Sequence, residues 1–418
     1  MILAHGKIFD TKEQNAILDK LQADTNETLL NKSVDTEKLI SAIETMSKRL
    51  SDGEYSDMIA ELNIGAAEGY VGKAAELLSR KNAELVINAG KPDLPQLEDL
   101  DSKIYPVGVL FHIAAGNIDV LPAYSVLQGL LCGNINVLKL PSQDNGITVK
   151  ILSELIGIMP ELSDFIYVFD TPSSDLAAMF TMAEAADKII VWGGDEAVAA
   201  VRRFAPPYTD IVTWGHKTGF AYVCENYAEH EEELYGLAKH IVKTGQLFCS
   251  SCQRIFIDTE SKKTAEAFCE YFLPLLERAR EEEDGGDIGA EAEFTLQKLT
   301  AKIERIINEE QKPDKTFFGK GCSVTLCAKP ELSASGFFGN IGVSALAKDK
   351  LFGVLRSKKG YLQTACLIGC EENIKELVIR AGVCRVMRPA DMSEAFAGEG
   401  HDGEYELNRY RRTVNIQR

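Results

Sequence analysis

The thiol of Cys249 is the side chain of this sequence best placed to do chemistry, within the stretch Gly-Gln-Leu-Phe-Cys-Ser-Ser-Cys-Gln-Arg at 245–254. The stretch joins a predicted helix to a predicted strand. A thiol in such a short, serine-rich loop can attack a carbonyl carbon, because nearby hydroxyls and backbone N–H groups can hold the oxyanion that forms. The pattern favours a nucleophilic cysteine at 249.

Cys249 and Cys252 also form a Cys-x-x-Cys pair, which is typical of half a zinc site or of a redox-active dithiol. A closed zinc site needs two further ligands, and the cysteine pairs 322/327 and 366/370 lack the close spacing of a zinc ribbon. Most of the ten cysteines lie in apolar runs, where a thiol behaves as a small hydrophobic side chain. We therefore expect no metal site and one functional thiolate.

Two series of alternating strands and helices must position this loop. The first runs from residue 104 to about 204, and the second from 220 to about 387. Short β-branched runs that alternate with amphipathic helices predict parallel sheets covered by helices. The first hundred residues carry apolar side chains at spacings of three and four, which predicts a helical lead-in. Helices outside the two series are expected at 13–21, 36–50 and 58–78, and a further one within the second series at 291–310.

Charge and hydropathy exclude several classes of partner. The chain has 418 residues, with 63 acidic and 45 basic side chains and a net charge of -18. Such a balance repels phosphate backbones and anionic lipids, so we expect neither nucleic acid nor a membrane surface as partner. The start of the chain, 1–7, lacks the features of a secretory signal, and the most apolar stretch, 121–140, is interrupted by polar residues and glycines. We expect a cytoplasmic protein without a transmembrane helix.

Several motifs occur together in the order of a known family. They are 106–117 (Pro-Val-Gly-Val-Leu-Phe-His-Ile-Ala-Ala-Gly-Asn), 131–142 (Leu-Cys-Gly-Asn-Ile-Asn-Val-Leu-Lys-Leu-Pro-Ser), Trp192-Gly193-Gly194, Cys249-Ser250-Ser251, Leu362-Gln363-Thr364 and His401-Asp402-Gly403. With them the sequence resembles the aldehyde dehydrogenase superfamily, and within it the LuxC-type acyl-CoA reductases. The resemblance begins near residue 104 and implies an α/β fold of two Rossmann-like, three-layer domains after a helical N-terminal segment.

The resemblance implies roles for the residues around the reacting carbonyl. Cys249 falls at the position of the family's nucleophile, with Arg254 at the usual spacing after it, and would form a thioester intermediate. Asn117 matches the asparagine whose amide completes the oxyanion hole, where one donor typically contributes ~10²–10³ in rate. A turn or helix cap is the alternative role for Asn117.

The resemblance also implies a nicotinamide cofactor. Lys139 matches the lysine that contacts the adenosine ribose. NAD-preferring members carry a glutamate shortly afterwards, whereas this chain has Leu-Pro-Ser-Gln at 140–143. A lysine attracts a 2′-phosphate that a carboxylate would repel, so we expect NADPH, with Ser142 beside it. Gly193 and Gly194 fit a turn at the cofactor phosphates, although a Gly-Gly turn is also an ordinary loop.

One departure from the superfamily indicates the direction of the reaction. Thr-Trp-Gly-His-Lys at 213–217 stands where hydrolytic aldehyde dehydrogenases carry Glu-Leu-Gly-Gly-Lys, so the water-activating glutamate is missing. A thiol such as coenzyme A could then exchange with the enzyme thioester. The resemblance implies NADPH-dependent reduction of an acyl thioester, namely acyl-CoA, to an aldehyde through Cys249. His216 is a candidate proton donor or thiol activator, or else a structural histidine.

These inferences give an expected organisation and set of partners. We expect a nucleotide-binding α/β domain at 1–215, a catalytic α/β domain at 216–390 and a tail at 391–418 that returns to the first domain or to a neighbouring subunit. The resemblance implies a homo-oligomer and an acyl-protein synthetase as possible partner. Two alternatives stay open: another superfamily enzyme, such as a γ-glutamyl phosphate reductase or a CoA-acylating aldehyde dehydrogenase, and a non-catalytic scaffold.

Overall fold

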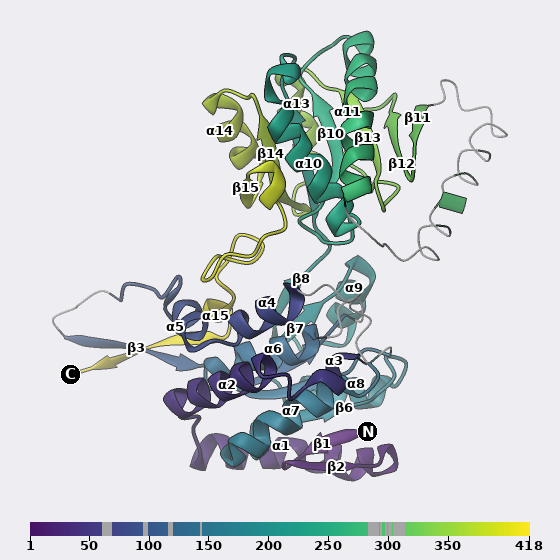
Figure 1. The fold of residues 1–418 in the computed structure, drawn as a ribbon. Helices are drawn as coiled ribbons and strands as arrows, with labels where there is room; N and C mark the ends of the chain where they lie inside the picture. The colour runs from purple at the N-terminus through teal and green to yellow at the C-terminus, as the bar shows by residue number, and fades with distance from the viewer. Residues whose placement is uncertain are drawn as a thin grey trace. The chain divides into compact units, whose positions relative to one another are not determined.

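The structure is a computed structural model of the full chain. It describes residues 1–60, 69–94, 99–115, 120–142, 144–282 and 314–418, together with isolated positions between 283 and 313. Asn117, Gln143 and the helix expected at 291–310 lie outside the described residues. The chain forms two compact units, Met1–Gly215 with Phe396–Arg418, and His216–Ala395 (Figure 1).

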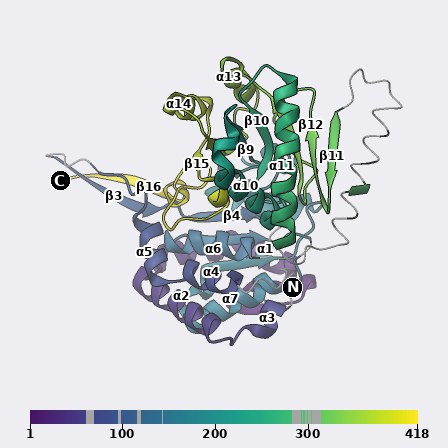
Figure 2. The same cartoon turned by 45° about the horizontal axis from the view of Figure 1, so that its top comes forward.

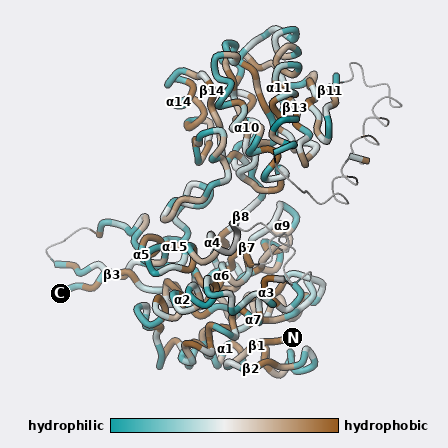
Figure 3. Tube along the Cα trace, viewed as in Figure 1, coloured by the Kyte–Doolittle hydropathy of each residue, from teal (hydrophilic) through white to brown (hydrophobic). Residues whose placement is uncertain are grey.

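Unit 1 is built on a seven-stranded sheet, in which the last five strands in spatial order are parallel to one another. In spatial order the strands are β2 (Lys7–Phe9), β1 (Ile2–Ala4), β6 (Ile166–Phe169), β5 (Ile135–Lys139), β4 (Val109–Ile113), β7 (Lys188–Trp192) and β8 (Asp210–Trp214). Residues of β4, β5 and β6 are all buried, because a parallel sheet covered on both faces leaves no strand face to solvent. Figure 3 shows the resulting hydrophobic interior.

Helices cover both faces of this sheet. They are η1 (Thr11–Glu13), α1 (Gln14–Asn31), α2 (Thr36–Ser51), α3 (Ser56–Ala60), α4 (Gly69–Leu77), α5 (Arg80–Asn88), α6 (Leu121–Leu131), α7 (Ile147–Ile158), η2 (Pro160–Asp164), α8 (Leu176–Glu184), α9 (Asp195–Phe204) and α15 (Glu406–Arg409). The helix α2 begins at a regular cap, since the Asp35 carboxylate accepts hydrogen bonds from the N–H groups of Glu37 and Lys38.

The N-terminal segment differs from the purely helical lead-in expected. Strand β1 pairs antiparallel with β6, and β2 extends the sheet beyond β1. The side chains of Ile2 and Leu3 are fully buried. Three-residue strands leave almost no periodicity in a sequence, and β1 finds its partner β6 only about 165 residues later in the chain.

A two-stranded antiparallel ribbon, β3 (Leu100–Pro106) with β16 (Arg411–Gln417), projects from unit 1 (Figure 1). The start of the first expected series, at residue 104, is thus divided between two sheets. Val107 and Gly108 separate the end of β3 at Pro106 from the start of β4, and Gly108 has a φ of 139°. A Cβ at Gly108 would lie 2.1 Å from an oxygen of Asp187, so this turn requires glycine.

Unit 2 contains a second seven-stranded sheet, shown from another direction in Figure 2. Its strands in spatial order are β11 (Lys315–Gly319), β12 (Cys322–Leu326), β13 (Asn340–Ala345), β10 (Cys252–Ile257), β9 (Thr218–Val223), β14 (Leu362–Ile368) and β15 (Arg385–Met387). All neighbours are parallel except β11 and β12. The helices are η3 (Tyr227–His230), α10 (Glu231–Thr244), α11 (Lys262–Glu282), α13 (Lys348–Arg356), α14 (Glu372–Ala381) and η4 (Pro389–Asp391).

Each face of the second sheet has its own hydrophobic core. Ala221 and Val223 of β9 pack with residues of α10 and α11, whereas Phe220 and Tyr222 pack with residues of α13 and α14. This is the two-residue alternation of a strand between two helical layers. Unit 2 extends to Ala395 because Met392 is fully buried in the core on the α10 side.

Candidate active site

The loop that carries Cys249 leaves α10 through two residues of left-handed conformation. Gly245 has a φ of 54°, and Gln246, which is not a glycine, has a φ of 64°. The fully buried Gln246 amide donates to the carbonyl oxygen of Cys252 at 3.1 Å and accepts from the N–H of Gly339 at 3.2 Å. These bonds hold a backbone conformation that a non-glycine residue rarely adopts, as is common at functional loops.

Cys249 is exposed at the end of this loop. The side-chain amide of Gln363, at the start of β14, donates a hydrogen bond to the Cys249 sulfur at 3.3 Å. Gln363 is only 3% exposed, so its position is set by the packing of the strand. An N–H donor stabilises a thiolate more than a thiol, and Gln363 is therefore a component of the site. Gln363 belongs to the Leu-Gln-Thr motif at 362–364, but no role for it could be inferred from the sequence.

The neighbouring serines fix the loop on the sheet. Ser251 donates its hydroxyl to Thr244 at 3.2 Å, and Ser250 donates its hydroxyl to Ser393 at 2.8 Å. Beneath them lies Gly219 of β9, where a Cβ would come within 2.6 Å of the Ser251 carbonyl oxygen and 2.7 Å of the Ser250 carbonyl oxygen. Glycine at this position lets the loop lie directly against the strand.

The second thiol of the Cys-x-x-Cys pair has a different environment. Cys252 is fully buried on β10, and burial raises the pKa of its thiol to about 12. Its N–H donates to His240 Nε2 at 3.4 Å. Cys249 and Cys252 thus differ in exposure. Within the described part of the chain, no group of three or more His, Cys, Asp or Glu side chains is arranged to hold a metal ion.

Arg254 lies inside the second sheet. It is 7% exposed, and its Nη2 donates to the Ser333 hydroxyl at 2.6 Å. Its Nε and Nη1 find no hydrogen-bond partner among the described residues. A Cβ at Gly342 on the neighbouring strand would lie 2.3 Å from Nη1, so glycine there makes room for the guanidinium. Arg254 thus follows the loop of Cys249 on β10 and is held by neighbouring parts of unit 2.

The cofactor residues expected in unit 1 gather at one edge of its sheet. Strand β4 lies between β5 and β7, so Lys139 at the end of β5 and Gly193 after β7 lie at the carboxyl edge, on either side of β4. After β4 the chain continues to β5 on one side, and after β7 it continues to β8 on the other side. The point between β4 and β7 is therefore a topological switch point, where open α/β sheets bind ligands. Asn117 comes four residues after β4 and lies outside the described residues.

Lys139 is 5% exposed, and its Nζ donates to the Ser173 hydroxyl at 2.9 Å. Burial lowers the pKa of Lys139, and the carboxylate of Asp170 opposes this shift. Asp170 in turn pairs with the N-terminal amine of Met1 at 3.2 Å. Ser142 lies in an exposed turn after β5. A partly desolvated lysine at this edge is suited to an anionic ligand group.

Gly193 and Gly194 connect β7 to α9. Gly194 caps the helix, and a Cβ there would meet no atom within 4 Å, whereas a Cβ at Gly193 would lie 3.1 Å from Ala197. The turn is therefore tight on the helix side and open at Gly194, which fits the approach of a phosphate to backbone N–H groups. Two carboxylates in the first turn of α9, Asp195 and Glu196, weaken this attraction for anions.

The histidines occupy three kinds of environment. His216 is exposed, two residues before β9, at the same edge of the second sheet as the loop of Cys249. His112 is fully buried and contacts Ser125 at 2.7 Å and Asn136 at 3.0 Å. The ring of His401 contacts those of Trp192 and Trp214, at centroid distances of 5.4 and 5.3 Å, and the two tryptophan rings also contact one another at 5.7 Å. His112 and His401 are thus packed within unit 1.

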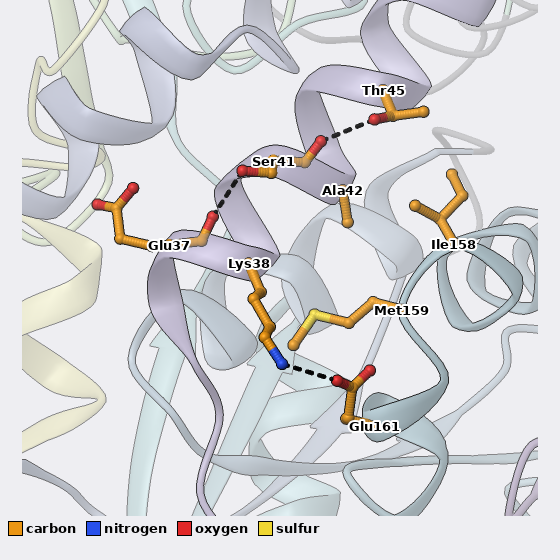
Figure 4. Close-up of a pocket in the computed structure, with 8 residues that line it drawn as sticks. All are labelled: Glu37, Lys38, Ser41, Ala42, Thr45, Ile158, Met159 and Glu161. Atoms are coloured by element: carbon orange, nitrogen blue, oxygen red, sulfur yellow. Dashed lines mark hydrogen bonds and ion pairs between the residues drawn. The ribbon is translucent and has the colours of Figure 1, made fainter.

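A separate pocket of about 430 Å³ lies on unit 1 between α2 and the end of α7 (Figure 4). Lys38 and Glu161 point toward one another across it, with 3.1 Å between Nζ and Oε1. None of the expected site residues lines this pocket.

No helix in the described ranges combines the length and the apolar character needed to cross a bilayer.

Comparison with solved structures identifies the class of fold. Glyceraldehyde-3-phosphate dehydrogenase GapN from Methanocaldococcus jannaschii, solved in complex with NADP, aligns with 99% of this chain and 96% of its own, with a TM-score of 0.71 and 12% identity. Aldehyde dehydrogenase 21 from Physcomitrella patens aligns with 98% of this chain and 90% of its own, with a TM-score of 0.71 and 14% identity. The chain has the aldehyde dehydrogenase-like α/β fold, as expected.

Comparison with sequence families is more specific. The model of the acyl-CoA reductase (LuxC) family matches residues 31–413, so the chain belongs to this family. Long-chain acyl-protein thioester reductase 2 of Photobacterium leiognathi is 26% identical over 334 residues, which cover 76% of this chain and 65% of that protein. The corresponding reductase of Aliivibrio fischeri is 27% identical over 157 residues, or 37% and 33% of the two chains. The matched regions span less than two thirds of these relatives.

Proposed function

We propose that the protein reduces an acyl thioester to an aldehyde through a covalent thioester on Cys249. The observation that carries this proposal is the exposed thiol held in a strained loop with an amide N–H of Gln363 on its sulfur. Membership of the acyl-CoA reductase family supports it. A donor on the sulfur favours the thiolate, which is the nucleophile in acyl transfer.

The steps at Cys249 follow from this arrangement. The Cys249 sulfur attacks the acyl carbon and displaces the thiol of the donor, for which we propose coenzyme A. On sequence grounds the Asn117 amide stabilises the oxyanion, together with the N–H of Cys249. After reduction of the acyl carbon, the carbon–sulfur bond breaks, the aldehyde leaves and the thiol is restored. His216, exposed at the same edge of the sheet, is proposed as the proton donor.

We propose NADPH as the reductant, which supplies a hydride when bound. Lys139, Ser142, Gly193 and Gly194 would hold its ribose and phosphates at the carboxyl edge of the sheet in unit 1. The open turn at Gly194 and the buried ammonium group of Lys139 fit such a ligand. In this proposal unit 1 binds the nucleotide and unit 2 carries the nucleophile.

The names of the relatives raise a second source for the acyl group. The similar proteins of Photobacterium leiognathi and Aliivibrio fischeri are named for acyl-protein thioesters. We propose that an acyl-protein synthetase can load Cys249 directly, and that the protein acts as a homo-oligomer in the cytoplasm. Both donors lead to the same thioester on Cys249.

The test is NADPH oxidation by the purified protein with acyl-CoA thioesters of graded chain length, with NADH and acetyl phosphate as parallel controls. Oxidation that depends on the thioester and varies with chain length is the expected result. Oxidation with acetyl phosphate alone would instead support an acyl phosphate reductase. Binding of NADPH without oxidation by any thioester would contradict the free acyl-CoA as substrate.

A further inference from the structure

A second group of thiols lies at the carboxyl edge of the sheet in unit 2. Cys224 follows β9, and Cys370 follows β14 by two residues. Cys249, in contrast, precedes β10 and lies at the amino edge, beside Gln363 at the start of β14. The six residues of β9 separate the two edges by roughly 20 Å at ~3.3 Å per residue, so the second group is distinct from the proposed active site.

The register of the sheet brings these two cysteines close together. Val223 pairs with Ile368 in parallel, and the N–H of Cys224 donates to the Ile368 carbonyl at 3.0 Å. Cys224 is thus opposite Gly369, and Cys370 is one residue further along. Because neighbouring strands lie ~4.8 Å apart, the two cysteines are neighbours at the ends of adjacent strands.

Because Gly369 has no side chain, the Cys224 sulfur and the His230 ring can lie directly against it. A Cβ there would lie 2.1 Å from the Cys224 sulfur and 2.6 Å from His230 Nε2. Gly369 has a φ of 66° and is exposed, and both thiols are partly exposed. The Cys370 thiol reaches back to strand β9, where it donates to the Tyr222 carbonyl at 3.5 Å.

His230 is oriented to act as a base toward Cys224. Its Nδ1 contacts the Glu233 carboxylate at 2.8 Å. A carboxylate only accepts, so Nδ1 carries the proton and, in the neutral ring, Nε2 is the nitrogen with a free lone pair. The Cys224 thiol donates to the Asn226 side-chain oxygen at 2.6 Å, and both the Cys224 sulfur and His230 Nε2 lie beside Gly369. The arrangement is that of a thiol, a base and a group that orients the base.

We propose that Cys224 and Cys370 form a redox-active dithiol that is oxidised to a disulfide by low-molecular-weight disulfides such as oxidised glutathione. His230 takes the proton of Cys224, whose sulfur attacks the small disulfide and releases one small thiol. Cys370 then attacks the mixed disulfide at Cys224 and releases the second small thiol. Two protons and two electrons pass from the protein to the reagent, and one S–S bond forms for the one that breaks.

Other cysteines are less suited to this reaction. Cys252 and Cys366 are fully buried, and β9 lies between the strands that carry them. Cys269 is fully buried on α11. The pair at the carboxyl edge combines adjacency, partial exposure and a neighbouring base. Its disulfide would join β9 to β14, the same two strands that support the loop of Cys249 through Gly219 and Gln363 at their other ends.

The test is peptide mapping after oxidation. The purified full chain is incubated with oxidised glutathione, its remaining thiols are blocked with N-ethylmaleimide, and it is digested without reduction. We expect linked peptides that contain Cys224 and Cys370 in the wild type and in the matched control Cys384→Ser. The Cys224→Ser variant should lose the link, and Cys370→Ser should instead accumulate glutathione on Cys224.

Two further results decide the roles of the partners. His230→Gln should slow the formation of the link relative to Cys384→Ser, whereas a purely structural histidine would leave the rate unchanged in variants that melt at the same temperature. The link should also form in Cys249→Ser, which separates this proposal from the proposed function. The proposal would be overturned if N-ethylmaleimide labelled Cys224 and Cys370 independently after the incubation with oxidised glutathione. It would also be overturned if the Cys370→Ser variant carried no glutathione.

Discussion

The amide of Gln363 should control the reactivity of Cys249, and its replacement by methionine tests this role. Methionine has nearly the same volume but no N–H donor, so the buried site remains filled. The structure gives a donor–sulfur distance of 3.3 Å with Gln363 only 3% exposed. A hydrogen bond to a charged group contributes about 1.5–3 kcal/mol, and one between neutral groups about 1 kcal/mol. The substitution should therefore destabilise the thiolate relative to the thiol by about 0.5–2 kcal/mol, which corresponds to a roughly 2- to 30-fold loss of thiolate.

The assay is the rate of alkylation of Cys249 by iodoacetamide at pH 7, followed by mass spectrometry of the labelled peptides. Cys384 serves as an internal reference, because its N–H donates to the Gln363 carbonyl at 2.9 Å and it reports any movement of the strand. We expect alkylation of Cys249 to slow by roughly 2- to 30-fold while that of Cys384 is unchanged. An unchanged rate at Cys249, or an equal change at both thiols, would refute the reasoning.

Three other outcomes are expected. Cys249→Ser should abolish turnover and leave NADPH binding within about twofold by calorimetry, whereas Cys252→Ser should retain turnover, because that thiol is buried with a pKa raised to about 12. Lys139→Met should raise KM for NADPH by more than tenfold, at a cost of over ~1.4 kcal/mol, and affect KM for NADH less; equal effects would contradict a role at the 2′-phosphate. Burial lowers the pKa of His112 and of His240 to about 4, from ~6.5 in the unfolded chain. Between these two pH values each histidine is neutral in the folded protein, whereas it binds a proton in the unfolded chain. The free energy of unfolding should therefore decrease as the pH falls from about 6.5 to 4, by on the order of 3 kcal/mol per histidine, and urea denaturation at several pH values measures this.

The fold class and the family could be predicted because their evidence is local. Alternating apolar runs and helices predicted both sheets, and the order of short motifs indicated the aldehyde dehydrogenase superfamily and its LuxC branch. Both are confirmed. The helix expected at the start of the chain is present as α1, although it extends to Asn31.

The elements that the sequence did not indicate depend on distant pairing. The strand β16 has mostly exposed side chains and pairs with β3, some 300 residues earlier, so its own residues show no hydrophobic face. Gln363 meets Cys249 only because β14 and β10 flank β9 in one sheet. A side chain 114 residues from the nucleophile cannot be assigned to its site by spacing. The proposed roles of Asn117 and His216 still rest on sequence position.

The most direct test of the proposed covalent thioester is the intact mass of the protein after incubation with a long-chain acyl-CoA in the absence of reductant. We expect an increase equal to one acyl group, located on the Cys249 peptide, absent from Cys249→Ser and removed when NADPH is added with release of the aldehyde. An unmodified protein that still oxidises NADPH with the same acyl-CoA, or an adduct that persists in Cys249→Ser, would contradict it.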